Sequence, residues 1–420
     1  MDYENAARSR AVGIFPEIGI RFVRVGSPLK LMFSHRTNWR LSPNALTRAI
    51  EEARASGQTI LDLTVSNPTE AGIRPDSEIV LAALANPEAM HYDPQPRGLL
   101  GARQAVCRYY REGHEVFDLD PERLLLTTST SEAYSYVFRL LSNPGDEILV
   151  PKPSYPLFEF LADLADVKLV PYPLLYDHGW QIDFDSLYQA ATTRSRAVVL
   201  VHPNNPTGSY VSAAETSALN AFCRDYSLAL IVDEVFLDYA FDGSVRRSFV
   251  TNADALTFTL SGVSKISALP QMKLAWVTTG GPKEMVREAG ARLEIIADTF
   301  LSMNAPVQLA APVLLDQRKQ VQPILLDRLR VNLAELDRQL VDHLSCTRLM
   351  VEGGWYVVLR VPVLGTDEDL AVHLLREANV SVHPGHFYDF PVEGHLVLSL
   401  ITDPANFREG VARLLQVVEA

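Results

Sequence analysis

The chain of 420 residues has little cysteine, no long hydrophobic run and no excess of positive charge. Its three cysteines, Cys107, Cys223 and Cys346, lie far apart without CxxC spacing. That pattern argues against disulfides and metal sites and predicts reduced thiols in a cytoplasmic protein. No apolar run approaches the roughly 20 residues that cross a bilayer, so we expect no membrane partner. The net charge of −13 argues against nucleic acid as a partner, because phosphate binding requires a basic surface.

The N-terminal residues differ from the rest of the chain. Their moderately apolar sequence is interrupted by Pro16 and Arg21, so it lacks the continuous hydrophobic segment of a signal peptide. Met32 stands before FSHR (33–36), which is a typical beginning for a protein. We therefore expect residues 1–32 to be an N-terminal extension or the product of a misplaced start codon.

The remaining chain has the pattern of a protein with helices and strands in alternation. It has more residues than a single hydrophobic core usually accommodates, which predicts two domains. From about residue 45, short β-rich runs alternate with helical patterns. The runs AVVLV (197–201) and LALIV (228–232) are apolar on both faces, as in strands buried between the helical layers of a parallel or mixed sheet.

The last third of the chain follows a different pattern. Two long helical patterns, at residues 282–297 and 306–343, precede a smaller α+β pattern. We predict an α/β protein whose large domain has a mostly parallel central sheet between helical layers, plus a smaller α+β domain formed by both chain ends. The predicted ranges are 33–79 and 311–420 for the small domain and 80–310 for the large domain, with the second long helix joining them.

Three polar motifs each follow a buried strand, and they point to one site. They are NNPTG (204–208), DEVF (233–236) and SGVSK (261–265). Ligands of open α/β sheets bind beyond the carboxyl ends of the strands. A lysine among small residues after an apolar strand can be desolvated, which lowers its pKa and makes it an amine nucleophile. A carboxylate at the end of an apolar run is costly unless it meets a cation, such as a protonated pyridine nitrogen.

With these motifs the chain resembles the aspartate aminotransferase superfamily, fold type I of the pyridoxal-phosphate enzymes, in its class I/II aminotransferase branch. The resemblance extends from about residue 33 to the C-terminus. The matching segments are HYDPQPRGLLGARQAV (91–106), LTTSTSEAY (126–134), PKPSYPLF (151–158), HPNNPTG (202–208), DEVF (233–236) and SGVSKISALPQMKLAW (261–276).

The resemblance implies a role for each matched position. Lys265 would form an imine with pyridoxal 5′-phosphate and move a proton between the substrate and the cofactor. Asp233 would pair with the pyridinium nitrogen, Asn205 would bond the ring 3′-oxygen, and Tyr155 would stack on the ring. The expected phosphate contacts, partly at a helix N-terminus where free N–H groups favour an anion, are Ser129, Thr130, Ser131, Ser264 and Lys273.

Tyr92 matches a tyrosine that reaches the phosphate of the neighbouring subunit in the family. The resemblance therefore implies a homodimer with composite active sites.

Three cofactor positions depart from the family pattern. Lys273 replaces the usual arginine and neutralises phosphate only as a point charge. Gly262 replaces a serine, although Ser261 lies beside it. Phe236, beside the ring, replaces a tyrosine that donates to the ring 3′-oxygen, which predicts a higher imine pKa than in relatives that keep the tyrosine.

A fourth departure concerns the substrate. The arginine that usually clamps the substrate α-carboxylate, two residues before a serine, is here Val397 in HLVLS (395–399). Either another cation binds the carboxylate or the substrate carries none at that position. The candidates for substrate contacts are Arg36, Arg40, Asn67 and Arg360, and the loop VHPGHFYDF offers His383, His386 and Tyr388.

The function predicted from the resemblance is transfer of an amino group from an amino acid or amine to a 2-oxo acid. The same cofactor and fold also serve lyases, decarboxylases and condensing synthases, so the fold alone does not separate these reactions. A regulatory domain that binds the cofactor is a third interpretation. The acidic charge and the short N-terminal segment, which is too short for a winged helix, argue against it.

Overall fold

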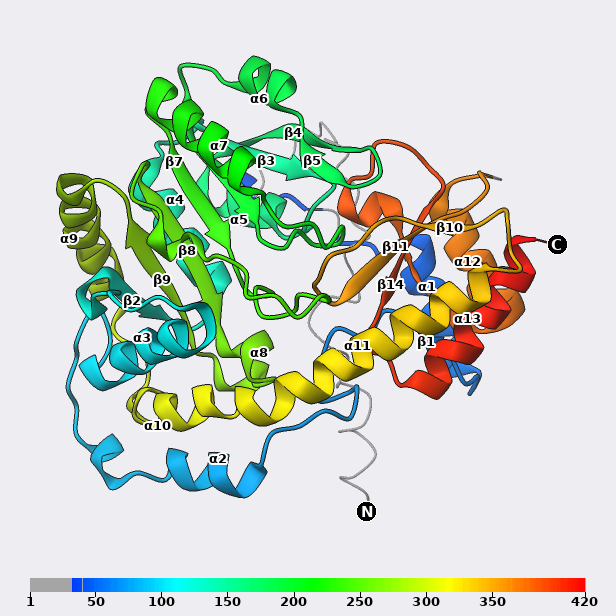
Figure 1. Ribbon diagram of the computed structural model, residues 1–420, viewed down its shortest axis with the longest axis horizontal. Helices are drawn as coiled ribbons and strands as arrows, with labels where there is room; N and C mark the ends of the chain where they lie inside the picture. Colours follow the sequence, from blue (N-terminus) through cyan, green and yellow to red (C-terminus); the bar gives the residue numbers. More distant parts are fainter. Residues whose placement is uncertain (1–31, 40, 364, 420) are drawn as a thin grey trace.

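In the computed structural model, residues 32–39, 41–363 and 365–419 are described. The predicted extension, apart from Met32, and the candidate Arg40 lie outside the described residues. Two separate sheets organise the described part of the chain, one of eight strands and one of four, with a further two-stranded pair beside the smaller sheet (Figure 1).

The eight-stranded sheet is mostly parallel. Strands β3, β4, β6, β7 and β8 pair in parallel, whereas β9 is antiparallel to both of its neighbours and β5 is antiparallel to β4. In spatial order the strands are β2 (Leu124–Thr127), β9 (Ala275–Gly280), β8 (Thr257–Gly262), β7 (Ala229–Asp233), β6 (Ser195–Val201), β3 (Glu147–Lys152), β4 (Lys168–Tyr176) and β5 (Trp180–Ile182). Because β2 and β8 are both antiparallel to β9, the strands β2, β3, β6, β7 and β8 all end at the same edge of the sheet.

Helices cover both faces of this sheet, which explains why its central strands are apolar on both sides. One face packs against α4 (Thr130–Leu141), α5 (Phe158–Ala165) and α9 (Lys283–Phe300). The other packs against α6 (Phe184–Ala190) and α7 (Ala213–Tyr226), and farther along against α3 (Leu100–His114) and α10 (Ala305–Asp316). All residues of β7 are buried, as the sequence predicts.

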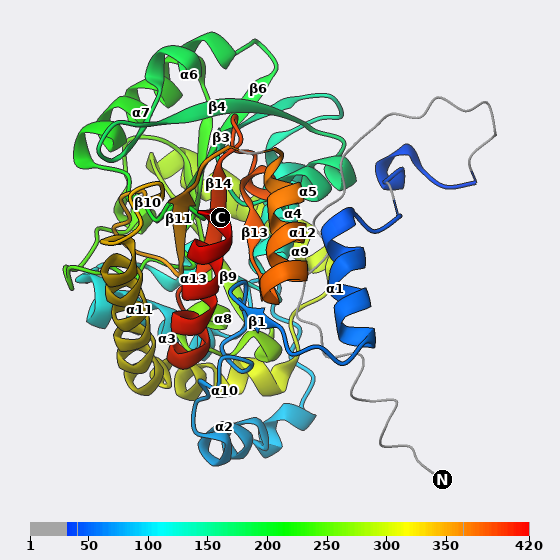
Figure 2. The same cartoon turned by 90° about the vertical axis from the view of Figure 1, so that its right-hand side faces the viewer.

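The smaller sheet is antiparallel and belongs to the C-terminal part of the chain. Its order is β10 (Thr347–Arg348), β11 (Tyr356–Arg360), β14 (His395–Ser399) and β13 (His383–Pro384). Two N-terminal elements join it: β1 (Leu61–Asp62) pairs with β12 (Val380–Ser381), and α1 (Ala45–Ala55) packs on α12 (Asp367–Ala378), as Figure 2 shows. Helix α13 (Pro404–Val418) completes this unit, which both chain ends therefore build. The predicted fold class is confirmed, and the predicted domain boundaries stay a prediction.

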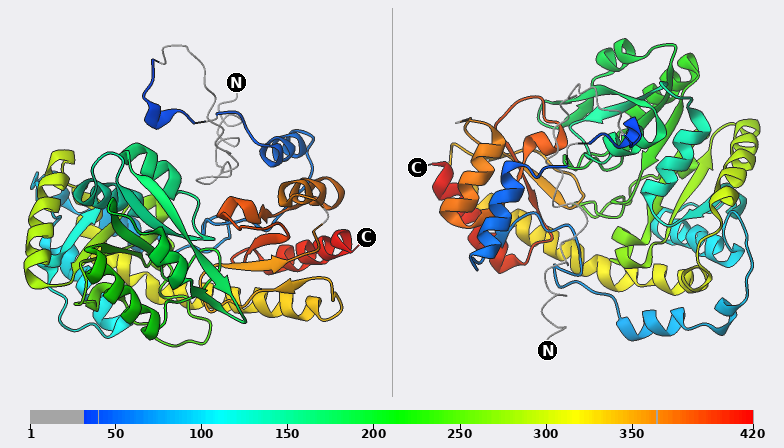
Figure 3. Two further views of the ribbon diagram at one scale, coloured as in Figure 1. Left: turned by 90° about the horizontal axis from the view of Figure 1, so that it is seen from above. Right: turned by 180° about the vertical axis from the view of Figure 1, so that it is seen from behind.

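One expected helix is in fact two. The pattern at 306–343 forms α10 and α11 (Arg318–Leu340), which meet at Gln317. Helix α10 packs on α2 (Ser77–Leu84) and α3 in the large unit, whereas α11 packs on α13 in the small one. The pair thus spans both units, which lie side by side in Figure 3. Within the described part of the chain, no helix is both long and apolar enough to cross a membrane.

Candidate active site

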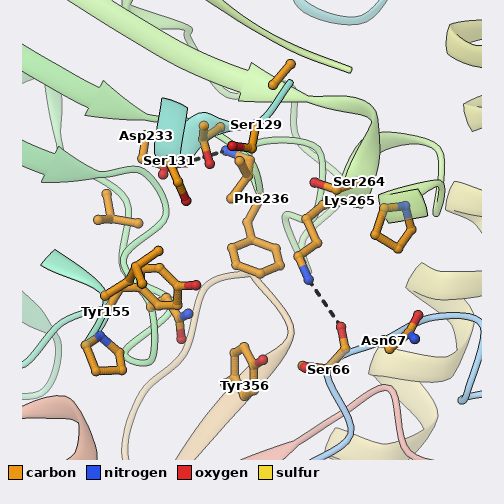
Figure 4. A pocket seen from close by; sticks show the side chains of 18 of the residues that line it. Ser66, Asn67, Ser129, Ser131, Tyr155, Asp233, Phe236, Ser264, Lys265 and Tyr356 are labelled. Carbon is orange, nitrogen blue, oxygen red and sulfur yellow. Dashed lines mark hydrogen bonds between the residues drawn. The ribbon is translucent and has the colours of Figure 1, made fainter. Parts of the chain in front are cut away.

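A pocket of about 320 Å³ lies at the shared edge where the parallel strands end. The predicted cofactor residues, except Tyr92, all line it, and several of them are labelled in Figure 4. Asp233 ends β7, Lys273 lies just before β9, and the others follow the ends of β2, β3, β6, β7 and β8. The small unit contributes the opposite wall from the loop after β1, from β11 and from the β13 region. The residues predicted from the sequence that line the pocket are Asn67, Ser129, Thr130, Ser131, Tyr155, Asn205, Asp233, Phe236, Ser264, Lys265, Lys273, His383 and Tyr388.

Lys265 lies on the short helix α8 (Val263–Ile266), directly after β8. Its Nζ donates a hydrogen bond to the carbonyl oxygen of Ser66 over 3.1 Å and lies 4.7 Å from the centre of the Trp355 ring. Burial among these groups lowers the pKa of the lysine to about 8, although the negative charge of Asp233 opposes the shift. Near neutral pH this amine therefore loses its proton far more readily than a solvated lysine.

Asp233 is the last residue of β7 and is buried. One carboxylate oxygen accepts the backbone N–H of Val235 at 3.1 Å, and the other accepts the hydroxyl of Tyr134 at 3.3 Å. Burial raises the pKa of Asp233 to about 6, because no cation among the described residues pairs with it directly. A cationic ring nitrogen in the pocket would supply the missing partner.

The two asparagines of NNPTG differ in what they contact. Asn204 is held inside the protein, since its amide donates to the Pro153 carbonyl and to Thr207. The Asn205 side chain is also buried, but its Oδ1 has no hydrogen-bond partner among the described residues, and it lines the pocket. A buried amide oxygen without a donor is costly, so Asn205 is suited to a polar ligand: Oδ1 can accept from a donor of the ligand, and Nδ2 can donate to a ligand oxygen.

The N-terminus of α4 lines the pocket and offers N–H groups of the kind that can bind an anion. The hydroxyl of Ser129 caps the helix by accepting the N–H of Glu132 over 3.1 Å. The first-turn N–H groups of Thr130 and Ser131 have no acceptor within the helix and line the pocket. Lys273 is exposed at the same end, and Ser264 lies beside Lys265.

The substitution of glycine at 262 fits the local packing. A Cβ at this position would lie 2.9 Å from the Cβ of Ala275 and from the carbonyl oxygen of Leu274, so a serine would crowd strand β9. Ser261 does not replace the missing hydroxyl. It is buried, lies 3.4 Å from the Glu234 carbonyl oxygen and is not part of the pocket wall.

Several residues of the site had no role assigned from the sequence. Tyr134 does not line the pocket but donates to Asp233 from behind it; it was part of a matched segment, one helical turn beyond Thr130. Ser66 and Tyr356 face the lysine from the small unit (Figure 4). Their positions depend on how the loop after β1 and strand β11 pack together, and no local sequence motif indicates this.

Three candidates lie outside the pocket of the single chain. Arg36 is half-exposed and pairs with Asp166 at the end of α5, and Arg360 is the exposed last residue of β11, with its guanidinium 5.8 Å from the ring centre of Tyr176. Both arginines therefore have other partners, and neither contacts the pocket as a substrate ligand would. Tyr92 is 74% exposed, so its hydroxyl does not reach the site of its own chain.

Val397 is buried in the core of the small unit and does not line the pocket. Its register partner on β13 is His383, which does line the pocket, as does Tyr388. His386, from the same loop, instead faces a separate hollow together with Asp367 and Phe390. No arginine is among the described residues that line the pocket.

Comparison with known proteins agrees with this geometry. Residues 58–414 match the family model of class I and II aminotransferases. The chain is 27% identical over 369 residues to glutamate-pyruvate aminotransferase AlaA of Haemophilus influenzae, covering 85% of this chain and 90% of that protein. It is 28% identical over 372 residues to alanine aminotransferase of Mycobacterium tuberculosis, covering 86% of each. The solved structure of alanine aminotransferase from Pyrococcus furiosus superposes with a TM-score of 0.79 at 23% identity, covering 89% of this chain and 96% of that one.

The chain belongs to the class I/II aminotransferase family, because the family model covers most of its length. It is an aminotransferase that uses pyridoxal phosphate and has the fold of type I enzymes. The buried carboxylate, the amide without a partner and the desolvated lysine all fit that cofactor.

Proposed function

We propose that this enzyme transfers the amino group of a small amino acid to a small 2-oxo acid, with Lys265 as its catalytic base and acid. The observation that carries this proposal is the convergence of Lys265, Asp233 and Asn205 on one pocket, each with unused bonding capacity. The names of its relatives, which act on alanine or on glutamate and pyruvate, support small substrates.

Each residue of the pocket has a defined task in this proposal. Bound pyridoxal phosphate supplies an electron sink for the substrate α-carbon. Asp233 keeps the ring nitrogen protonated, and Asn205 orients the ring through its 3′-oxygen. Tyr155 packs against the ring face. Lys265 holds the cofactor and then moves a proton to and from the substrate, for which a pKa near 8 is well matched.

The phosphate end of the cofactor is assigned to the N-terminus of α4. Ser129, Thr130 and Ser131 offer N–H and hydroxyl donors, and Ser264 and Lys273 complete the set. Phe236 contacts the ring region without donating a hydrogen bond.

We also propose a cytoplasmic homodimer in which Tyr92 reaches the phosphate of the partner subunit. Tyr92 and the nearby Met90 are both strongly exposed, at 74% and 90%, although such side chains are usually covered. Light scattering should give twice the chain mass of 46.6 kDa. A Tyr92→Phe variant should bind the cofactor more weakly. A monomer with full cofactor affinity would contradict the proposal. Three unpaired, buried cysteines support the cytoplasmic location.

The function is tested by mixing the purified yellow protein with single amino donors and recording its absorbance. Conversion of the cofactor to its pyridoxamine form, with release of the matching oxo acid, identifies the donor. Release of carbon dioxide, ammonia or thiol without that conversion would favour a lyase, decarboxylase or synthase instead.

A further inference from the structure

We propose that His383, supported by Tyr388, binds the substrate carboxylate in place of the arginine that relatives carry at the position of Val397. This inference rests on the proposed transamination and names the residues that recognise its substrates. His383 is then a specificity-determining residue, and Tyr388 a positioning residue.

The first step is that the register of the small sheet places His383 beside Val397. His383 on β13 pairs directly with Val397 on β14, and Val397 pairs in turn with Val358 on β11. Directly opposed residues of an antiparallel pair project from the same face and lie close together. A side chain at 383 therefore starts beside the one at 397, but only the histidine reaches the pocket.

The second step is the hydrogen bond within the pair. The Nδ1 atom of His383 and the hydroxyl of Tyr388 lie 3.0 Å apart. If the tyrosine donates to Nδ1, the other ring nitrogen of the neutral histidine carries a hydrogen. If Nδ1 donates, the tyrosine hydroxyl is free to donate elsewhere. In either arrangement the pair keeps one donor for an incoming oxygen atom.

The third step concerns how His383 and Tyr388 are held against the large unit. The backbone N–H of Ser154 donates to the Tyr388 carbonyl oxygen over 2.9 Å, and Lys152 pairs with Asp389 over 3.1 Å. These contacts join the helical turn η6 (Gly385–Tyr388) to the turn that carries Tyr155. The donor of the pair is thereby held on the small-unit side of the pocket, opposite the strand ends that carry the cofactor residues.

A neutral donor binds a carboxylate less strongly than an arginine does. Burial lowers the pKa of His383 to about 4, so the ring is uncharged at neutral pH. A hydrogen bond to a charged group is stronger than one between neutral groups, yet weaker than a bidentate guanidinium pair. We expect weaker carboxylate binding than in relatives that keep the arginine.

The test compares L-alanine with L-alaninol, which has a hydroxymethyl group where alanine has its carboxylate. In the half-reaction, His383→Ala should raise the half-saturating concentration of L-alanine about ten- to a hundredfold and that of L-alaninol less than about threefold. The maximal rate should change little in both cases. His383→Asn, which keeps a donor, should recover part of the loss, and adding Val397→Arg to His383→Ala should recover most of it.

Binding of propionate, measured by calorimetry, separates this inference from the proposed function. Propionate has no amino group, so it reports the carboxylate site without any reaction. If no donor reacts but His383→Ala abolishes propionate binding, the transamination proposal fails and the carboxylate site stands. If donors react and neither measurement changes in His383→Ala, the inference is overturned. His386→Ala serves as the matched control, since this neighbouring histidine lies outside the pocket.

Two further outcomes would also overturn the inference. One is a preference of the unaltered enzyme for L-alaninol over L-alanine. The other is a loss of propionate binding in Arg36→Ala or Arg360→Ala while His383→Ala retains it. Thermal unfolding and the cofactor absorbance of each variant verify that it is folded.

Discussion

The two walls of the pocket differ in how they are built. On the large-unit wall, Asn205, Asp233 and Lys265 each lie at or just beyond the end of a buried parallel strand, so the sheet itself aligns them. On the small-unit wall, Ser66, Tyr356 and His383 come from segments more than 20 residues apart that meet only through antiparallel pairing and loop contacts. The sheet therefore sets the position of each group on the first wall, whereas packing between distant segments sets it on the second.

This difference predicts two kinds of defect. Changes in the large-unit wall should lower the maximal rate or alter the cofactor spectrum. Changes in the small-unit wall should alter substrate affinity and leave the spectrum unchanged.

The largest effect is expected for Lys265→Ala. Loss of the amine removes both the attachment of the cofactor and the proton transfer, so the rate of the half-reaction should fall at least about 10⁴-fold. The yellow absorbance of the lysine-bound cofactor should also disappear. Lys273→Ala is the matched control, because this second lysine of the pocket should weaken cofactor binding yet preserve the absorbance. A Lys265→Ala protein with the original spectrum would refute the assignment of the whole wall.

Asp233→Asn should have the next largest effect. Replacing one partner of a buried charge pair costs about 3 kcal/mol or more, which corresponds to a rate at least about 100-fold lower. The cofactor should remain attached, so the defect should appear in the maximal rate. Tyr134→Phe removes only one hydroxyl donor to Asp233 and should lower the rate less than about tenfold. Equal effects of the two changes would argue against a charge pair at this position.

Much of the large-unit wall could be predicted from the sequence, because its information is local. An apolar run followed by DEVF or SGVSK already indicates a strand end with a polar group, and parallel strands bring such ends together. Tyr134 was not assigned a role, because its contact with Asp233 joins α4 to the end of β7, two elements far apart in the sequence.

The small-unit wall could not be predicted in the same way. Arg360 was a reasonable candidate, since it stands on the strand that also carries Tyr356, yet it lies at the exposed end of β11 and faces Tyr176. The break between α10 and α11 at Gln317 was equally hidden, because the helical pattern continues through it. Register and packing decide such features, and one sequence does not reveal them.

The reactivity of the protein without cofactor should show how strongly the pocket desolvates Lys265. Only the neutral amine attacks the aldehyde of pyridoxal phosphate, so the rate of reconstitution should rise about tenfold per pH unit and level off above pH 8, where the lowered pKa lies. At pH 6 it should be about one-hundredth of the plateau. Stopped-flow absorbance measures this rate, with free N-acetyl-lysine as the reference. A plateau only above pH 10 would mean that the lysine is solvated.

The smallest effects are expected when one hydroxyl is added to the large-unit wall or removed from the small-unit wall. Phe236→Tyr restores the donor that relatives place beside the ring 3′-oxygen and should lower the pKa of the lysine-bound cofactor by about half a unit to one unit, because a single hydrogen bond contributes about 1 kcal/mol. Tyr356→Phe removes a hydroxyl from the opposite wall and should leave that pKa unchanged while altering the half-saturating concentration of the donor by less than about tenfold. A spectroscopic pH titration of both variants decides the matter. If both changes shifted the cofactor pKa equally, the two walls would share one electrostatic environment. The division between cofactor and substrate contacts would then have to be redrawn around Lys265, whose Nζ lies 5.7 Å from the ring centre of Phe236 and 4.7 Å from that of Trp355.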